Sequence, residues 1–162
     1  MAGDIDPIAA ALARRAIIDP TVLDGHLEDL QERGFGDPAL DGLAKEIIRL
    51  RIEFNVLDSE ALRRHLTESG FNALLIDVER AAAYACAPFE QNDVTLAAAR
   101  SQWSHAFDVL SRVAALEDAL SVAKHDLAHG VGASAFMTLK SERDALRRAI
   151  KTGTIWTTDG PM

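Results

Sequence analysis

The sequence is poor in residues that cross-link chains or interrupt helices. Its 162 residues include one cysteine, Cys86, five prolines and ten glycines. One thiol cannot form an intrachain disulfide or a cysteine-rich zinc cage, because each needs at least two thiolates. Alanines surround Cys86 and no basic residue lies close to it in the sequence. We therefore expect a small buried side chain rather than a reactive thiol.

Long apolar runs are also missing. No stretch reaches the roughly 20 consecutive apolar residues that cross a bilayer, because charged residues interrupt every candidate. The first six residues include two aspartates and no basic residue, whereas a secretory signal starts with basic residues followed by an apolar run. We expect a cytoplasmic protein that does not enter the membrane.

Patterns typical of common catalytic scaffolds are absent as well. No strand pattern is present that could support a nucleophile elbow. The glycines at 34–36 and 130–132 lack the lysine and hydroxyl residue of a phosphate loop. Adjacent carboxylates such as Glu28 and Asp29 are typical of solvated helix faces rather than of acid–base sites. We therefore nominate no catalytic residue and expect no cofactor.

The five histidines raise the question of a metal site. His125 and His129 are four residues apart, so they share one face of a helix. A zinc-protease motif has glutamate directly after the first histidine, whereas Asp126 stands there, and no third ligand is evident. We expect a structural or solvent-exposed role for this pair and no metal site.

The formal net charge of -8 is unevenly distributed along the chain. Residues 1–92 contain 17 acidic and 9 basic side chains, whereas residues 93–162 contain 8 of each. An acidic segment repels nucleic-acid phosphates, whose binding depends on clustered lysine and arginine. We therefore expect no direct nucleic acid binding and favour a protein partner.

Helix-starting signals dominate the first half of the chain. Asp6-Pro7 and Asp37-Pro38 each combine a capping residue with a proline in the first turn. Apolar residues follow at helical spacing, and Gly25 predicts a break in the second segment. The sequence predicts an all-α fold whose N-terminal bundle, residues 1–92, has about five short helices at residues 7–18, 21–33, 37–55, 58–70 and 72–82.

The second half predicts one long helix and a helical hairpin, within residues 93–153. Apolar residues recur at steps of three and four from 93 to 129, and we assign Trp103 and Phe107 among them to the core rather than to stacking on a base or cofactor. Such a helix would be roughly 55 Å long, so part of it should project from a compact body. Ser134 predicts the cap of a last helix. Residues 154–162 are expected to form a flexible tail.

Three stretches are distinctive in their order and spacing. They are LARRAIIDPTVL at 12–23, SQWSHA at 101–106 and LKSERDALRRAI at 139–150. Together with a short-helix bundle, a long tryptophan-bearing helix and a terminal hairpin, they resemble the C-terminal helicase-binding domain of bacterial DnaG-type DNA primases, particularly the alphaproteobacterial members. The likeness covers roughly residues 5–155.

The resemblance implies docking onto the N-terminal region of the hexameric replicative helicase, which couples priming to unwinding. The N-terminal domain of the DnaB-type helicase has the same fold, so a helicase-derived fragment is an alternative. A complete primase also has a zinc-binding domain and a polymerase core, and this sequence contains neither. We therefore expect no enzymatic activity from this chain alone. A fragment of a longer protein and a free-standing relative both stay open.

We assign the partner contact to the hairpin. A two-helix arm leaves apolar side chains partly exposed, and a partner normally covers such a patch. Basic residues of the last helix would orient docking. The predicted partner-binding residues are Leu116, Leu120, Leu127, Phe136, Leu139, Arg143, Leu146, Arg147, Arg148 and Lys151.

Two other functions stay open. The hairpin could mediate weak self-association into a homodimer. The chain could also be a free-standing helical regulator, or a DNA-binding protein with a helix-turn-helix within residues 38–70. The acidic surroundings of that segment argue against DNA binding.

Overall fold

The computed structural model describes residues 5–54, 58–90, 93–130, 132–152 and 155. These residues are almost wholly helical and include no strand, which confirms the predicted all-α class. The chain forms two compact units, residues 1–104 and 105–162. No helix in the described ranges is long and apolar enough to cross a membrane.

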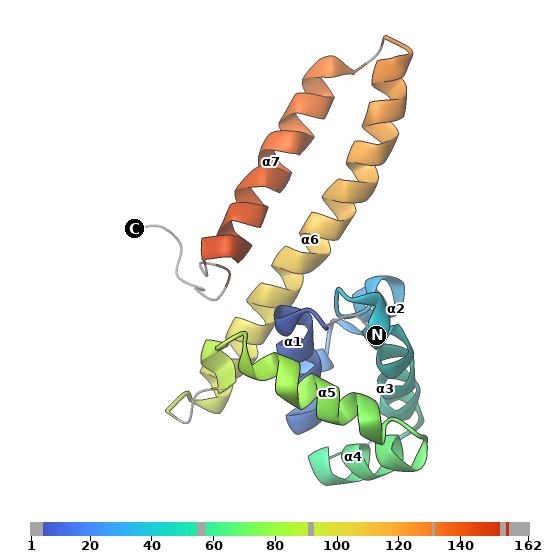
Figure 1. Ribbon diagram of the computed structural model, residues 1–162, viewed down its shortest axis with the longest axis vertical. Helices are drawn as coiled ribbons and strands as arrows, with labels where there is room; N and C mark the ends of the chain where they lie inside the picture. Colours follow the sequence, from blue (N-terminus) through green and yellow to red (C-terminus); the bar gives the residue numbers. More distant parts are fainter. Residues whose placement is uncertain (1–4, 55–57, 91–92, 131, 153–154, 156–162) are drawn as a thin grey trace. The chain divides into compact units, whose positions relative to one another are not determined.

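The first unit is built from short helices and 3-10 turns (Figure 1). In chain order they are α1 (Pro7–Ile18), η1 (Pro20–Leu23), α2 (Leu27–Arg33), η2 (Pro38–Leu40), α3 (Asp41–Glu53), α4 (Ser59–Glu68), α5 (Asn72–Ala83), η3 (Pro88–Glu90) and the start of α6 (Leu96–Ala128).

Aspartate caps start several of these elements as predicted. The Asp6 side chain accepts a hydrogen bond from the backbone N–H of Ala9 at 3.1 Å, and Asp58 accepts one from Ala61 at 2.7 Å. Asp37 caps the 3-10 turn η2 and not an α-helix, so α3 begins only at Asp41. Proline in the first turn suits both kinds of helix because its missing N–H has no intrahelical acceptor there.

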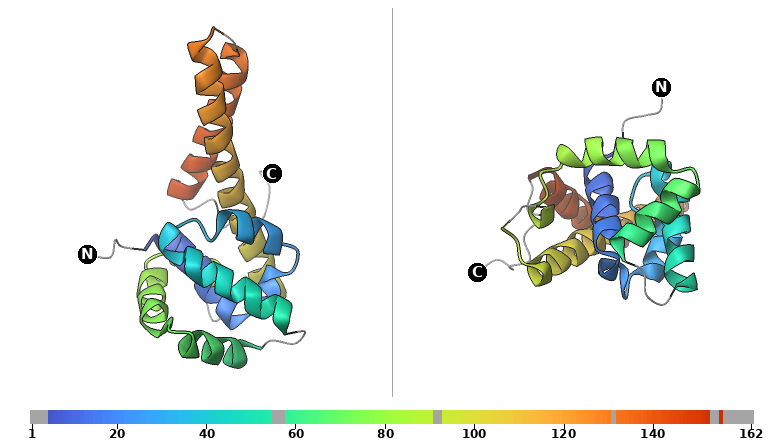
Figure 2. Two further views of the ribbon diagram at one scale, coloured as in Figure 1. Left: turned by 90° about the vertical axis from the view of Figure 1, so that its right-hand side faces the viewer. Right: turned by 90° about the horizontal axis from the view of Figure 1, so that it is seen from below.

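The alanine-rich helix α1 is the centre of the first unit. Nearly every side chain from Ala9 to Ile17 is buried, and α1 packs most extensively against α5. Views of the unit from two directions show neighbouring helices around it (Figure 2). Its many alanines let surrounding backbones approach closely, so a helix whose only charged residues are Arg14 and Arg15 is stable here.

Two polar contacts tie the start of α6 to α1 and the turn after it. The fully buried indole of Trp103 donates a hydrogen bond from Nε1 to the carbonyl oxygen of Leu12 at 2.9 Å. Arg100 donates two hydrogen bonds, of 2.8 and 3.0 Å, to the carboxylate of Asp19, which is only 8% exposed. Trp103 and Phe107 are both buried, as predicted for core residues.

The second unit contains the rest of α6 and α7 (Ala133–Thr152), which run antiparallel and side by side (Figures 1 and 2). The sequence placed a boundary at residue 92, whereas the compact units divide after Ser104, inside α6. The physical reason is that Arg100 and Trp103 are bonded into the bundle. The predicted flexible tail, residues 154–162, lies outside the described residues apart from Ile155, which is buried.

Two local predictions were wrong at helix ends. The long helix begins at Leu96 and not at residue 93, because the Thr95 hydroxyl accepts a hydrogen bond from the N–H of Ala98. The last helix begins at Ala133, so Ser134 lies inside it. The carbonyl of Gly132 accepts the first hydrogen bond of that helix, from Phe136, and the Ser134 carbonyl accepts one from the Thr138 hydroxyl.

The prediction that Cys86 is buried was also wrong. Cys86 is exposed and has a φ of 50°, in the turn that follows α5. The helix ends at Ala83, before the alanine run does, and the chain turns so that Ala87 and Phe89 are buried while Cys86 is exposed. Composition around a residue indicates burial only where the element continues through it.

Replacing Trp103 by alanine should destabilise the protein by about 3–5 kcal/mol, because a fully buried aromatic ring and its hydrogen bond are both lost. Urea unfolding followed by circular dichroism measures this change. Tyr84→Ala is a matched aromatic control, since the Tyr84 side chain is 78% exposed, and it should change stability by less than about 0.5 kcal/mol. Equal effects of both substitutions would contradict the placement of Trp103.

Replacing Asp19 by asparagine should flatten the acid side of the stability profile. Hydrogen bonds from Arg100 hold the pKa of Asp19 below its ordinary value, although burial opposes them. Such a carboxylate stabilises the fold fully above its pKa in the unfolded chain, about 3.9. That stability is lost as the pH falls through the lower pKa of the folded state. Urea unfolding at several pH values between about 2 and 7 tests this, and parallel curves for both proteins would argue against it.

Candidate functional site

The hairpin of α6 and α7 contains all the predicted partner-binding residues. The second half of α6 and all of α7 are free of glycine and proline and rich in alanine, leucine and arginine, which favour helix. The chain reverses between Gly130 and Gly132, whose φ values of 78° and 83° are readily adopted by glycine. Both helices are therefore formed by their own local sequence.

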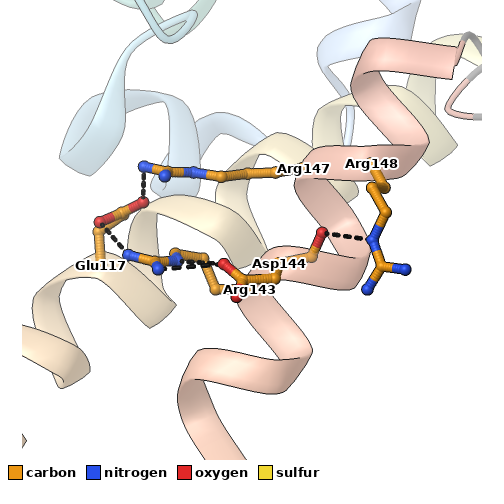
Figure 3. A network of polar contacts seen from close by, with 5 residues as sticks. All are labelled: Glu117, Arg143, Asp144, Arg147 and Arg148. Carbon is orange, nitrogen blue, oxygen red and sulfur yellow. Dashed lines mark hydrogen bonds and ion pairs between the residues drawn. The ribbon is translucent and has the colours of Figure 1, made fainter.

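Ion pairs join the two helices. Glu117 of α6 accepts a hydrogen bond from Arg147 and lies 3.6 Å from Nη1 of Arg143, so two guanidinium groups of α7 share one carboxylate (Figure 3). Arg112 of α6 donates two hydrogen bonds to Glu142, of 2.9 and 3.0 Å. These bonds raise the pKa of Arg112 and lower that of Glu142. Pairing at two levels fixes the register of α7 along α6.

Apolar residues of the hairpin differ in how much they are covered. Leu116 and Leu120 of α6 are buried. The remaining predicted apolar contact residues are half-buried, namely Leu127, Phe136, Leu139 and Leu146. No residue of α7 is fully buried. The leucines at 116 and 120 therefore stabilise the fold, whereas the other four also offer part of their surface to solvent.

The structure separates the four predicted basic contact residues into two pairs. Arg143 and Arg147 are bound to Glu117, and Arg143 also donates two hydrogen bonds to Asp144, of 3.0 and 3.1 Å (Figure 3). Arg148 and Lys151 are exposed. In the described part of the chain, neither of these last two forms an ion pair. Arg148 donates only a 3.5 Å hydrogen bond to the backbone carbonyl oxygen of Asp144 (Figure 3), so no described acidic group neutralises its charge or that of Lys151.

A cationic stripe runs along the outer side of α7. It consists of Met137, Lys140, Arg148 and Lys151, which is called the outer stripe here. Their spacing places them within a sector of about 80° at 100° per residue, beside the half-buried face. Met137 is 61% exposed and the three basic residues are exposed too. Asp144 also falls on this sector, but its carboxylate is bonded to Arg143.

Sequence reasoning missed the exposed apolar residues of the hairpin. Met137 and Val122 are 61% and 64% exposed. Helical spacing could have found both, because Met137 lies beside the apolar face of α7 and Val122 lies about 120° around α6 from Leu116. Single exposed apolar residues are normal on a protein surface, and Met137 is of interest because it lies beside the half-buried apolar face of α7.

A charged cluster also lies within the first unit. Arg14 of α1 forms ion pairs with Glu79 at 2.7 Å and with Glu90 at 3.3 Å. Burial raises the pKa of Glu90, and Arg14 opposes this only in part. Burial also acts to raise the pKa of Glu79, but hydrogen bonds from Arg14 and Arg63 outweigh it and the pKa falls. The cluster joins α1, α4, α5 and η3, so its evident role is to hold the bundle together.

A hollow between α2 and α3 is the other feature that resembles a site. It has a volume of about 210 Å³ and is lined by residues of both charges, including Arg33, Asp41 and Lys45. Ligand pockets usually measure roughly 300–1,000 Å³ and are mostly apolar. We assign no ligand to it. Within the described ranges, no group of three or more histidine, cysteine or acidic residues could hold a metal ion.

Comparisons with known proteins give no relative. No protein-family model, no curated protein and no solved structure matches this chain. Its function is therefore inferred from its own residues.

Replacing Glu117 by glutamine should loosen α7 from α6. The variant keeps the shape of the side chain and removes the charge that holds Arg143 and Arg147. Because these groups are partly exposed, the expected loss is about 0.5–1 kcal/mol. Hydrogen exchange of α7 amides measures it. Glu68→Gln, at the end of α4, is the control and should leave exchange in α7 unchanged. Equal protection in all three proteins would show that the ion pairs do not fix the hairpin.

Proposed function

We propose that this chain is the helicase-binding domain of a bacterial DnaG-type primase and that α7 contacts the N-terminal region of the hexameric replicative helicase. The bundle of α1 to α5 is the platform, and the hairpin of α6 and α7 is the contact arm. The chain itself performs no catalysis in this proposal. The main observation in support of this proposal is the exposed outer stripe of α7, a helix that has no fully buried residue.

The positions of the three distinctive stretches support the proposal. The stretch at 12–23 forms the buried end of α1 and the turn η1, and its Leu12 carbonyl accepts the hydrogen bond from Trp103 of the second stretch. The stretch at 139–150 lies within α7 and supplies the arginines that pair with Glu117. Residues that carry the resemblance thus also form key contacts of both units.

The chemistry of the outer stripe supports a protein partner with an acidic surface. Helix α7 contains five basic and two acidic residues. The basic ones at 140, 148 and 151 form no ion pair with described residues. Such charges speed association and select orientation more than they add affinity. Met137 and the half-buried Phe136 and Leu139 supply the apolar contact that a stable complex also needs.

Reversing charge on the outer stripe should weaken helicase binding. The double variant Arg148→Glu with Lys151→Glu is expected to lower affinity by about tenfold, mainly through slower association, with a larger effect at low ionic strength. Surface plasmon resonance against the purified hexameric helicase gives both rates. Lys45→Glu, an exposed change on α3, should leave binding unaltered.

Three outcomes would refute this assignment. Helicase affinity that survives deletion of residues 128–162 would place the contact outside the hairpin. Light scattering that shows a stable homodimer, broken by the double variant, would make the stripe a self-association surface. Strongly salt-dependent binding of a labelled DNA duplex would instead support the DNA-binding alternative.

A further inference from the structure

His125 and His129 form a pair of exposed imidazoles in the hairpin. They lie one turn apart at the end of α6, where His125 is in its last turn and His129 follows its final residue. Their ring centroids are 4.7 Å apart and the planes are inclined by 45°. Both residues are exposed, so a small ion can reach the two rings from solvent.

A hydrogen bond defines which nitrogen of His129 is available. Its Nδ1 lies 3.0 Å from the carbonyl oxygen of His125. A carbonyl oxygen only accepts hydrogen bonds, so Nδ1 carries the proton, and the neutral ring leaves a lone pair on Nε2. Histidines that bind metals commonly donate their other N–H to a backbone carbonyl, which fixes the tautomer and the orientation of the ring. His129 is therefore held in the tautomer whose Nε2 can bind a metal ion.

We propose that His125 and His129 chelate one borderline divalent cation, such as Zn²⁺, Ni²⁺ or Cu²⁺, through their Nε2 atoms, with water in the remaining positions. Imidazole nitrogen selects this class of cation over Mg²⁺ and Ca²⁺, which prefer oxygen. Zinc binds imidazole nitrogen at about 2.0–2.1 Å, and rings one helical turn apart can reach a common ion at such distances.

Two features explain why spacing alone did not favour this site. The sequence offered no third ligand, and a closed structural zinc site needs four. An open two-histidine site needs no further protein ligand, because water fills the other positions, but its affinity is lower. The hydrogen bond that sets the tautomer of His129 is visible only in the structure. The site is independent of helicase docking, so failure of either proposal leaves the other standing.

Titration of the full chain with Zn²⁺, followed by long-range proton–nitrogen NMR of the histidine rings, tests the site. The Nε2 signals of His125 and His129 should shift together and saturate at one equivalent, while the Nδ1 proton of His129 persists. His125→Asn and His129→Asn should each weaken binding by at least about tenfold. His105→Asn, in the same helix but half-buried, should not.

Three results would overturn the proposal. They are a titration that does not saturate, equal affinity in the variants and the parent, and shifts confined to one histidine. Circular dichroism of each variant verifies that the helices remain intact. Because both rings are exposed, substitution should not impair folding.

Discussion

The rest of the structure depends on the packing of Trp103 against α1. Its ring is fully buried, and its indole N–H is bonded to a carbonyl of the central helix α1. A buried indole without an acceptor would cost free energy, so this bond selects one position for the start of α6. The same continuous helix, from Leu96 to Ala128, then supplies Arg112 and Glu117 to the hairpin. One element thus serves as core in the first unit and as scaffold in the second.

Local features of this fold are readable from sequence because their causes are local. Asp6 and Asp58 start helices through hydrogen bonds to backbone groups three residues away, and helical periodicity places Trp103 inside. Predictions failed where a competing local group decided the outcome. Thr95 caps α6 in place of the residues before it, and Gly132 begins α7 ahead of Ser134. Cys86 is exposed because the chain turns just before it.

The candidate site was less predictable because its charges find partners across two helices. Spacing within α7 shows that Arg143, Arg147, Arg148 and Lys151 are neighbours on one helix, but not which of them meets an acid of α6. That depends on the register of α7 along α6. The register is seen only in the structure, where Glu117 pairs with Arg143 and Arg147, and Glu142 pairs with Arg112. Arg143 and Arg147 therefore also have a structural contact, whereas Arg148 and Lys151 are exposed and form no ion pair with the described residues.

In the proposed complex, the uneven distribution of charge along the chain would make the outer stripe selective. Residues 1–92 carry the excess of 17 acidic over 9 basic side chains, whereas α7 carries five basic and two acidic ones. An acidic partner would therefore be repelled by residues 1–92 and attracted by α7. Like charges that oppose wrong approaches contribute to specificity in addition to the attractive contact. In a basic chain, Lys140, Arg148 and Lys151 would only add to a general attraction. In this acidic chain they favour one orientation of the approaching partner.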